Sequence, residues 1–178
     1  YRKEVTGSLD DATLRDLNDR LSYLRKFVPG YENCFIISSG SLIGIRETRH
    51  FKGKYTLNEN DILEARVFED YVVKDAFFNF DVHNITGAGL DETGVQKHFS
   101  QKKGYTIPYR CLLPEVKENL LLCGRNISGT HMAHSNFRVM PICVGIGEAA
   151  GTAAFIASTK SISLNDIDAS QIRDIIGI

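Results

Sequence analysis

The sequence predicts an α/β fold, because short apolar segments alternate along the chain with segments of helical periodicity. The clearest case runs from Asn119 to Ser158, where an apolar strand leads into Gly124-Arg125, a polar loop with two histidines, and a helix almost without charge. α/β proteins use a strand, a glycine-bearing turn and a helix to direct backbone N–H groups at a phosphate or another electron-rich ligand. This segment therefore predicts a ligand site as well as a fold.

The first element is a predicted helix over residues 9–28. Acidic residues come early in it and basic residues late, which complements the helix macrodipole. Pro29-Gly30 ends the helix. Its apolar residues recur at helical spacing, at Leu14, Leu17, Leu21, Leu24 and Val28.

The next segment, residues 34–52, is predicted to form two strands around a Ser-Ser-Gly-Ser turn at 38–41. One face of the second strand is strongly polar, since every second residue carries a polar side chain: Arg46, Thr48 and His50. A short helix then follows Thr56, which has Glu59 three residues later in the form of a capping box.

The remaining elements complete the predicted fold. Residues 83–104 are a polar, glycine-bearing loop, and Pro108 favours an edge position for the strand that contains it. The predicted strands are 76–82, 105–113 and 119–123, and the predicted helices are 136–158 and 168–176.

Composition narrows the classes of function. The net charge of −1 and the absence of a basic run argue against nucleic acid and a membrane surface as partners, which leaves a small molecule or another protein surface. The four cysteines include no CxxC pair, so a zinc ribbon or a thioredoxin-like site is disfavoured and a reduced compartment is favoured. With 178 residues, the chain fits one domain or a domain with an appendage.

The stretch Gly145–Ala150 has the form GxGxxG/A, with acidic residues about 20 positions later. A dinucleotide fingerprint requires a strand before it, but the preceding stretch is short and includes Pro141. A continuous helix with its small residues on one packing face is favoured instead. The apolar run at 139–157 is also long enough to span a membrane, but Pro141 and Glu148 argue against a span. Gly147 and Gly151 are expected at a close helix crossing inside a soluble core.

His131-x-x-His134 has two histidines at a spacing found in metal sites, but it supplies only two ligands and lacks the helical glutamate of HExxH. Structural or substrate-facing histidines are favoured, and no metal site is predicted. Ser128 does not lie in a GxSxG elbow, so a hydrolase nucleophile is disfavoured. Arginines in apolar surroundings need a partner, and several together indicate an anionic or electron-rich ligand; these are Arg46, Arg49, Arg110, Arg125 and Arg138.

Three stretches in this order resemble the carboxy-terminal half of bacterial FAD-dependent oxidoreductases, in which a substrate-facing domain interrupts a Rossmann-like FAD domain. The resemblance extends over most of the chain. The stretches are 43–63 (IGIRETRHFKGKYTLNENDIL), 105–114 (YTIPYRCLLP) and 119–154 (NLLLCGRNISGTHMAHSNFRVMPICVGIGEAAGTAA).

The resemblance implies that the last strand and helix return to the FAD domain, with the helix N-terminus directed at the flavin ring. The helix dipole would then stabilise negative charge on the reduced flavin. The implied FAD-binding residues are Gly124, Arg125, Arg138, Val139, Met140, Pro141 and Gly147. The candidate catalytic residues are His131, His134 and Arg138, with the histidines handling protons. The implied substrate-facing residues are Arg46, Arg49, Tyr109 and Arg110.

The family's amino-terminal strand–GxGxxG–helix is missing from this chain, so we expect a fragment of a flavoenzyme. Residues 1–114 would be a portion of the substrate-facing domain, with a mixed sheet, and residues 115–178 the return segment of the FAD domain. Such a fragment is α+β in isolation and holds FAD poorly or not at all.

The parent protein is expected to be a cytoplasmic enzyme that transfers a hydride between a small-molecule substrate and flavin. The alternative is a catalytically silent binding or assembly module, which forms a homodimer through the helix at 139–157.

Overall fold

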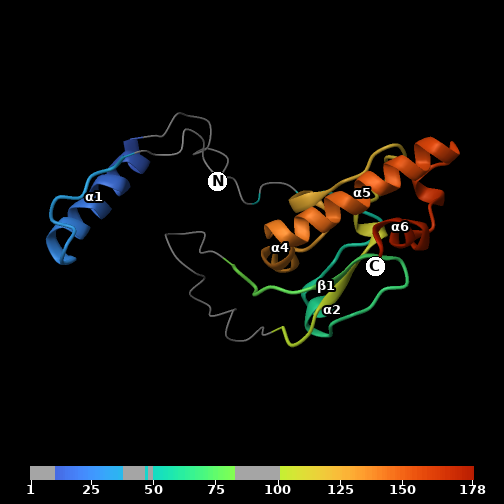
Figure 1. Cartoon of the computed structure of the whole chain (residues 1–178), viewed down its shortest axis with the longest axis horizontal. Helices are drawn as coiled ribbons and strands as arrows, with labels where there is room; N and C mark the ends of the chain where they lie inside the picture. Colours follow the sequence, from blue (N-terminus) through green and yellow to red (C-terminus); the bar gives the residue numbers. More distant parts are fainter. Residues whose placement is uncertain (1–10, 38–46, 48–49, 83–100) are drawn as a thin grey trace. The chain divides into compact units, whose positions relative to one another are not determined.

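The computed structural model describes residues 11–37, 47, 50–82 and 101–178, without the side chains of residues 11–17. The chain divides into two compact units, Tyr1–Ile45 and Arg46–Ile178. The first contains α1 (Asp11–Phe27), which confirms the predicted first helix to within two residues at each end (Figure 1). Arg25 and Lys26 lie in its last turn, and the Nε of Arg25 donates to the carbonyl of Cys34 at 2.9 Å. Residues 34–37 are not a strand, and most of the predicted strand pair lies outside the described residues.

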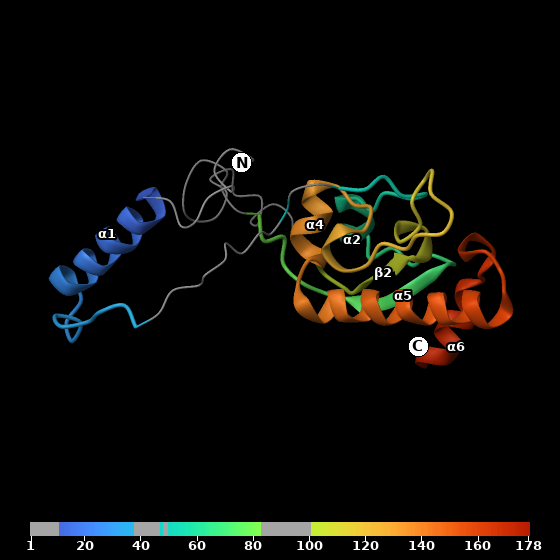
Figure 2. The same cartoon turned by 90° about the horizontal axis from the view of Figure 1, so that it is seen from above.

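The second unit has a two-stranded antiparallel sheet with helices packed on it. The strands are β1 (Tyr71–Ala76) and β2 (Tyr105–Pro108), and α5 and α6 both contact β1 (Figure 2). The helices are α2 (Glu59–Leu63), α4 (His131–Phe137), α5 (Met140–Lys160) and α6 (Ala169–Ile176), and the 3₁₀ turns are η1 (Tyr109–Cys111), η2 (Gly124–Asn126) and η3 (Leu164–Asp166). Helices with a small sheet are consistent with the predicted α/β class, whereas the Rossmann-like portion stays a prediction.

The sheet corrects two predicted strands. β2 begins at Tyr105 as predicted, but it ends at Pro108 rather than at residue 113, because Pro108 pairs with Tyr71 at the end of the ladder and the chain then turns into η1. The strand predicted for 76–82 is wrong, because β1 lies earlier and ends at Ala76. The ladder stops there because Ala76 already pairs with Tyr105, the first residue of β2.

The single helix predicted for 136–158 is wrong, because the chain forms two helices that are interrupted at Arg138 and Val139. Pro141 explains the interruption: it has no N–H to donate to the carbonyl of Phe137, four residues earlier. Arg138 ends α4 by donating its N–H to the carbonyl of His134, and the extended Val139 caps α5. Pro141 then lies in the first turn of α5, where a missing N–H costs nothing.

Two further elements differ from their predictions. Residues 119–123 form no strand: the backbone of Leu122 bonds that of Leu112 at 2.9 Å, without a continuous ladder, and Leu120 is exposed. An apolar segment becomes a strand only where a second strand pairs with it along its length. The capping box of α2 belongs to Asn58 and Asp61 rather than to Thr56 and Glu59, since the Asn58 side chain accepts from the backbone of Asp61.

α5 has a buried face and an exposed one. Its core residues are Ile142, Ile146, Ala149, Ala150, Ala153 and Ile156. A Cβ on Gly147 or Gly151 would meet no atom within 4 Å, so the close crossing predicted at these glycines is not found among the described residues. Its length and hydropathy also satisfy the criteria for a membrane span, a test that core helices pass as well. The GxGxxG-like stretch lies wholly inside α5, which confirms the helical interpretation.

The carboxy-terminal helix α6 begins and ends as predicted. Asp168 caps it through the backbone N–H of Ser170 at 2.9 Å, and Gly177 ends it with a left-handed φ of 75°. Arg173 anchors the helix to β1, because its guanidinium lies 4.4 Å from the Tyr71 ring centroid and donates to the Tyr71 carbonyl at 2.9 Å.

Candidate functional site

Three histidine side chains meet at one carboxylate near the start of α4. His131 Nδ1 lies 2.7 Å from Glu47 Oε2, and His134 Nδ1 lies 3.5 Å from the same oxygen. His50 Nε2 contacts the other oxygen, Glu47 Oε1, and His50 Nδ1 lies 2.8 Å from the carbonyl of Gly129. We call Glu47, His50, His131 and His134 the histidine–carboxylate cluster.

Local hydrogen bonds position the two helical histidines. Thr130 caps α4, because its Oγ1 accepts from the backbone of Ala133 at 3.1 Å while donating to Glu59 Oε2 at 3.0 Å. The backbone of Thr130 donates to the carbonyl of Leu57 at 2.8 Å, which fixes the approach to the helix. His131 and His134 are one turn apart, so both side chains lie on the same side of α4.

Gly129 is required by close packing. A Cβ at this position would lie 2.5 Å from Cε1 of Phe137, far inside van der Waals contact. Phe137 is fully buried, and its ring meets the His134 ring edge-on with 5.4 Å between centroids. The residue whose carbonyl holds His50 thus also packs on the aromatic core beneath the cluster.

The three histidines of the cluster differ in how far they are buried. Only 2% of the His134 side chain is exposed, and burial lowers its pKa from 6.5 to about 4, although the charge of Glu47 opposes this shift. His134 is therefore neutral at pH 7. The His131 side chain is 58% exposed and that of His50 is 29% exposed, so His131 is the cluster histidine that solvent or a ligand reaches most easily.

The predicted cofactor residues surround η2 and the first half of α5, which contact each other. Gly124 has a left-handed φ of 73°, and Met140 and Pro141 are exposed at the start of α5. Burial raises the pKa of the Cys143 thiol, and Arg125 lies close enough to oppose part of that shift. Gly147 lies two turns into α5 on the same helix. The structure therefore brings Gly124, Arg125 and this part of α5 together.

Arg138 is held by an acid on a different segment. Its Nη2 donates to Asp81 Oδ2 at 2.7 Å and to the Asp81 carbonyl at 3.0 Å. Because its backbone N–H already bonds the carbonyl of His134, Arg138 ends α4 and offers no free backbone N–H to a ligand. The side chain instead ties the segment between the helices to the chain after β1.

The predicted substrate residues Tyr109 and Arg110 lie at a second place, a cavity of about 660 Å³ bordered by η1, η3 and the segment 66–70 that precedes β1. Tyr109 is buried and donates its hydroxyl to the carbonyl of Leu164 at 2.9 Å. Burial raises the pKa of Tyr109 to about 12, so the hydroxyl keeps its proton at neutral pH. Within the described part of the chain, neither residue forms a hydrogen bond or ion pair with the histidine–carboxylate cluster.

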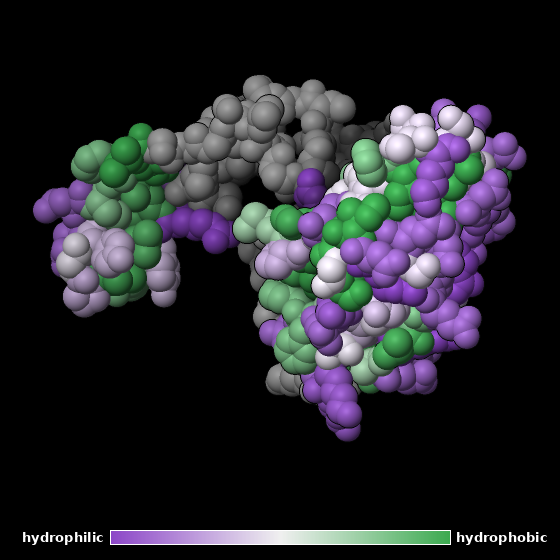
Figure 3. Space-filling model, turned by 45° about the vertical axis from the view of Figure 1, so that its right-hand side comes forward, coloured by the Kyte–Doolittle hydropathy of each residue, from purple (hydrophilic) through white to green (hydrophobic). Residues whose placement is uncertain are grey.

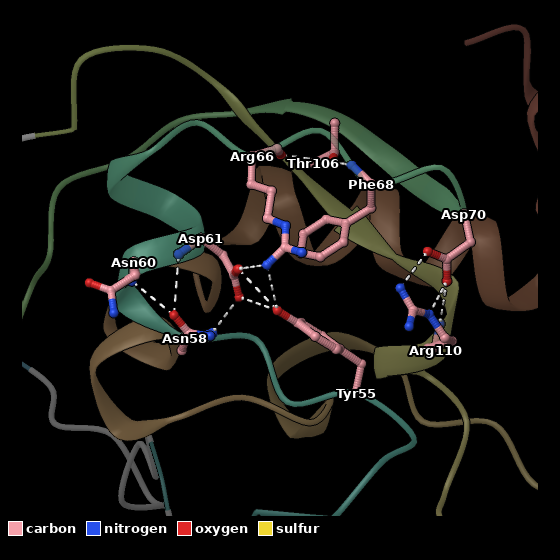
Figure 4. Close-up of polar contacts among 9 residues, drawn as sticks. All are labelled: Tyr55, Asn58, Asn60, Asp61, Arg66, Phe68, Asp70, Thr106 and Arg110. Atoms are coloured by element: carbon pink, nitrogen blue, oxygen red, sulfur yellow. Dashed lines mark hydrogen bonds and ion pairs between the residues drawn. The ribbon is translucent and has the colours of Figure 1, made fainter.

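Both arginines that line this cavity, Arg66 and Arg110, form ion pairs (Figure 4). Arg110 makes a two-pronged contact with Asp70, at 2.9 Å from Nε and 3.1 Å from Nη2. Arg66 donates to Asp61 Oδ1 at 3.0 Å, and the Tyr55 hydroxyl donates to the same carboxylate. These contacts satisfy the arginines internally, as expected of structural pairs.

Some predicted residues are not placed, and others were not predicted. Arg46 and Arg49 lie outside the described residues. Glu47 and His50 were missed as site residues, although His50 was noted in the polar alternation. Among residues 11–37, 47, 50–82 and 101–178, no group of three or more His, Cys, Asp or Glu has a geometry that could hold a metal ion.

A model of the family described as FAD dependent oxidoreductase matches residues 5–176, which is nearly the whole chain. The chain belongs to this family. No curated protein and no solved structure matches it. Membership assigns the chain to oxidoreductases that use FAD and agrees with the resemblance drawn from its motifs.

Two glycines of this FAD-dependent oxidoreductase leave open space beside the backbone. A Cβ at Gly124 or Gly147 would meet no atom within 4 Å, so a ligand can approach the backbone at both positions. The start of α5 is exposed beside them and has no acidic residue in its first turn, which favours a negatively charged group there.

Proposed function

We propose that the chain is a fragment of an FAD-dependent oxidoreductase that transfers a hydride between a small-molecule substrate and flavin. The observation that supports this most directly is the exposed His131 bonded to Glu47, in a chain that matches the family from residue 5 to residue 176. We further propose residues 1–114 as the substrate-facing portion, residues 115–178 as the return segment of the FAD domain, and the cytoplasm as the compartment.

Removing a hydride from a C–H bond of a substrate also releases a proton from the neighbouring O–H or N–H group. Bound flavin supplies the centre that accepts the hydride. His131 takes the proton, because its ring is accessible and its Nδ1 is fixed by Glu47. In the reverse direction His131 returns the proton to the substrate. His134 stays neutral and buried beside it, so it shapes the site without gaining charge.

The proposed cofactor contacts come from Gly124, Arg125, Met140, Pro141 and Gly147. The two glycines let the ligand reach the backbone, and the start of α5 favours negative charge near it. Val139 caps α5 and sets its direction, while Arg138 holds this segment against Asp81. Arg138 is thus proposed to act on the cofactor by positioning. Tyr109 and Arg110, with Arg46 and Arg49, remain the proposed substrate-facing residues.

The proposal is tested by measuring flavin in two purified proteins. The 178-residue chain alone should be colourless. The same chain joined to an upstream strand–GxGxxG–helix segment of this family should carry stoichiometric FAD, seen as a flavin absorption band. A fused protein that folds but binds no flavin would contradict the proposal.

We predict that Arg138→Ala weakens FAD binding by the fused protein roughly tenfold, which corresponds to about 1.4 kcal/mol. The change removes both contacts to Asp81, so the segment before α5 loses its anchor. Titration of the apoprotein with FAD measures the effect. Arg138→Lys keeps one charged contact and should lose less, and equal affinity of all three proteins would refute the assigned role.

The alternative function is a catalytically silent assembly module that pairs through α5. The outward face of α5 carries large apolar side chains, with Met140 82%, Val144 69% and Phe155 60% exposed. The space-filling view in Figure 3 shows apolar side chains, in green, on the surface of the molecule. Exposed apolar patches favour association.

If α5 is the interface, the chain alone forms a dimer by sedimentation at micromolar concentration, and Phe155→Ser shifts it to monomer. Phe77→Ser, which alters a similarly exposed phenylalanine outside α5, should leave the dimer intact. A monomer at high concentration would exclude the assembly function.

A further inference from the structure

The hydrogen bonds around Glu47 determine where the protons of the histidine–carboxylate cluster lie. The carbonyl of Gly129 can only accept, so the His50 nitrogen 2.8 Å from it, Nδ1, must carry a hydrogen. A neutral imidazole has one N–H, so a neutral His50 would present a lone pair at Nε2. That nitrogen contacts Glu47 Oε1.

A lone pair on His50 Nε2 and an ionised carboxylate would place two acceptors in contact. A proton must therefore lie between them, either on His50 as an imidazolium or on Glu47 as a carboxylic acid. In both cases the pair holds one proton more than a neutral histidine and a carboxylate. This proton cannot be lost through Nδ1 of His50, because the Gly129 carbonyl accepts a hydrogen bond there but is too weak a base to take the proton itself.

The second oxygen of Glu47 fixes His131. Oε2 accepts a hydrogen bond whether Glu47 is the ion or the acid with its proton at Oε1, so His131 Nδ1, at 2.7 Å, is the donor. The Nε2 of a neutral His131 then carries the lone pair, on a side chain that is 58% exposed. An orienting acid behind an accessible imidazole is how enzymes prepare a general base.

The surroundings keep this arrangement in place. His134 is neutral and lies edge-on to His50, with 5.3 Å between ring centroids. Arg138 is the other charged group near His134, and it is paired with Asp81. Among the described residues, Glu47 is the carboxylate that pairs with all three histidines, and no second carboxylate forms an ion pair with them.

We infer that Glu47 and His50 are positioning residues that hold a shared proton and thereby keep His131 in the tautomer whose Nε2 takes the substrate proton. When Nε2 gains that proton, His131 becomes an imidazolium. The shared proton then resides on His50, which leaves Glu47 as a carboxylate between two cations. The proton-placing part of this inference depends only on residues of this chain, and the part about the substrate rests on the proposed function.

Nitrogen-15 NMR of the 178-residue chain, labelled at histidine, tests the inference at pH 7. His131 should show a protonated Nδ1 and an unprotonated Nε2, and His50 should show a proton at Nδ1 with a second proton shared at Nε2. A protonated Nε2 on His131, or an unprotonated Nε2 on His50, would overturn the inference.

Substitutions at Glu47 separate its two roles. Glu47→Gln keeps an oxygen for His131 and offers an amide N–H to His50, so His131 retains its tautomer while His50 loses its second proton. Glu47→Ala removes both effects, so His131 samples both tautomers. Glu115→Gln, at an exposed acid that pairs with Lys52, should leave both histidine patterns unchanged. Amide spectra report whether each variant is folded, and if Glu47→Ala is not, the glutamine variant decides.

The outcome of the flavin-binding test does not affect this one. The expected nitrogen pattern, found together with a fused protein that folds but binds no FAD, would support the proton placement and refute the proposed function. FAD binding with the opposite His131 tautomer would do the reverse. In the fused, FAD-bound protein, Glu47→Ala should lower kcat roughly 10²-fold or more, the range of general-base catalysis, with a smaller loss for Glu47→Gln.

Discussion

Phe137→Ala is expected to lower the free energy of unfolding by about 3–5 kcal/mol, the usual cost of emptying a large aromatic site in a core. Phe137 is fully buried, and its ring packs against the Gly129 backbone and the His134 ring. Alanine leaves a cavity that α4 and the loop before it can fill only by moving. Urea unfolding followed by circular dichroism gives the value.

Phe155→Ala is the matched control, because Phe155 is 60% exposed on α5 and its truncation should change stability by no more than about 0.5 kcal/mol. Phe137→Leu should lie between the two, since leucine fills part of the site. A loss below 1 kcal/mol for Phe137→Ala would show that the ring does not support the cluster.

Acidification from pH 6.5 to pH 4 is expected to destabilise the chain through His134, by an amount on the order of 2–3 kcal/mol. Burial lowers the pKa of His134 from 6.5 to about 4 in the folded state. Between these values the unfolded chain binds a proton that the folded chain does not. The free energy of unfolding therefore falls as the pH falls through this window, and this contribution is fully present above pH 6.5.

The difference between the wild type and His134→Gln isolates this contribution, since the carboxylates titrate in both proteins. Urea unfolding at pH 7 and pH 4.5 should show a smaller drop in the variant. The groups that act on His134 are Glu47, His50, His131 and Arg138, and all remain in the variant. Equal drops in both proteins would mean that His134 can take up a proton in the folded chain.

Local signals in the sequence determined the helices but not every boundary. The apolar spacing of α1 and the Asp168 cap of α6 are readable because they depend on neighbouring residues. The break before α5 was also encoded, by Pro141, but the charge-poor run around it suggested one continuous helix. The exact cap of α2 was missed because Asn58 and Thr56 are both good N-cap residues, and tertiary contacts to Ser128 engage Thr56.

Strands were harder to predict because they depend on distant partners. The run at 119–123 is apolar enough for a strand, but in the described part of the chain its backbone bonds a neighbouring segment at Leu122 alone, through the carbonyl of Leu112. β1 was placed several residues too late, since the apolar stretches 71–73 and 76–80 are equally suited to a strand and only the pairing with β2 distinguishes them.

The sequence predicted part of the candidate site. The His131 and His134 pair stands out in the sequence, but Glu47 is more than 80 residues away and reaches it only in the folded chain. Periodicity cannot report such a contact. Arg138 and Arg110 were noticed as arginines in apolar surroundings, and both do have acidic partners, in Asp81 and Asp70. Which arginines face a ligand was beyond what residue type alone can tell.

Gly129 restricts how this protein can change over evolutionary time. Any side chain there displaces the Phe137 ring, and the resulting shift would also move the carbonyl that orients His50. A mutation at this position therefore needs a compensating, smaller residue at position 137 before it can be tolerated. Related sequences should either keep the glycine and phenylalanine together or replace them as a pair, and a library that randomises both positions would reveal that linkage.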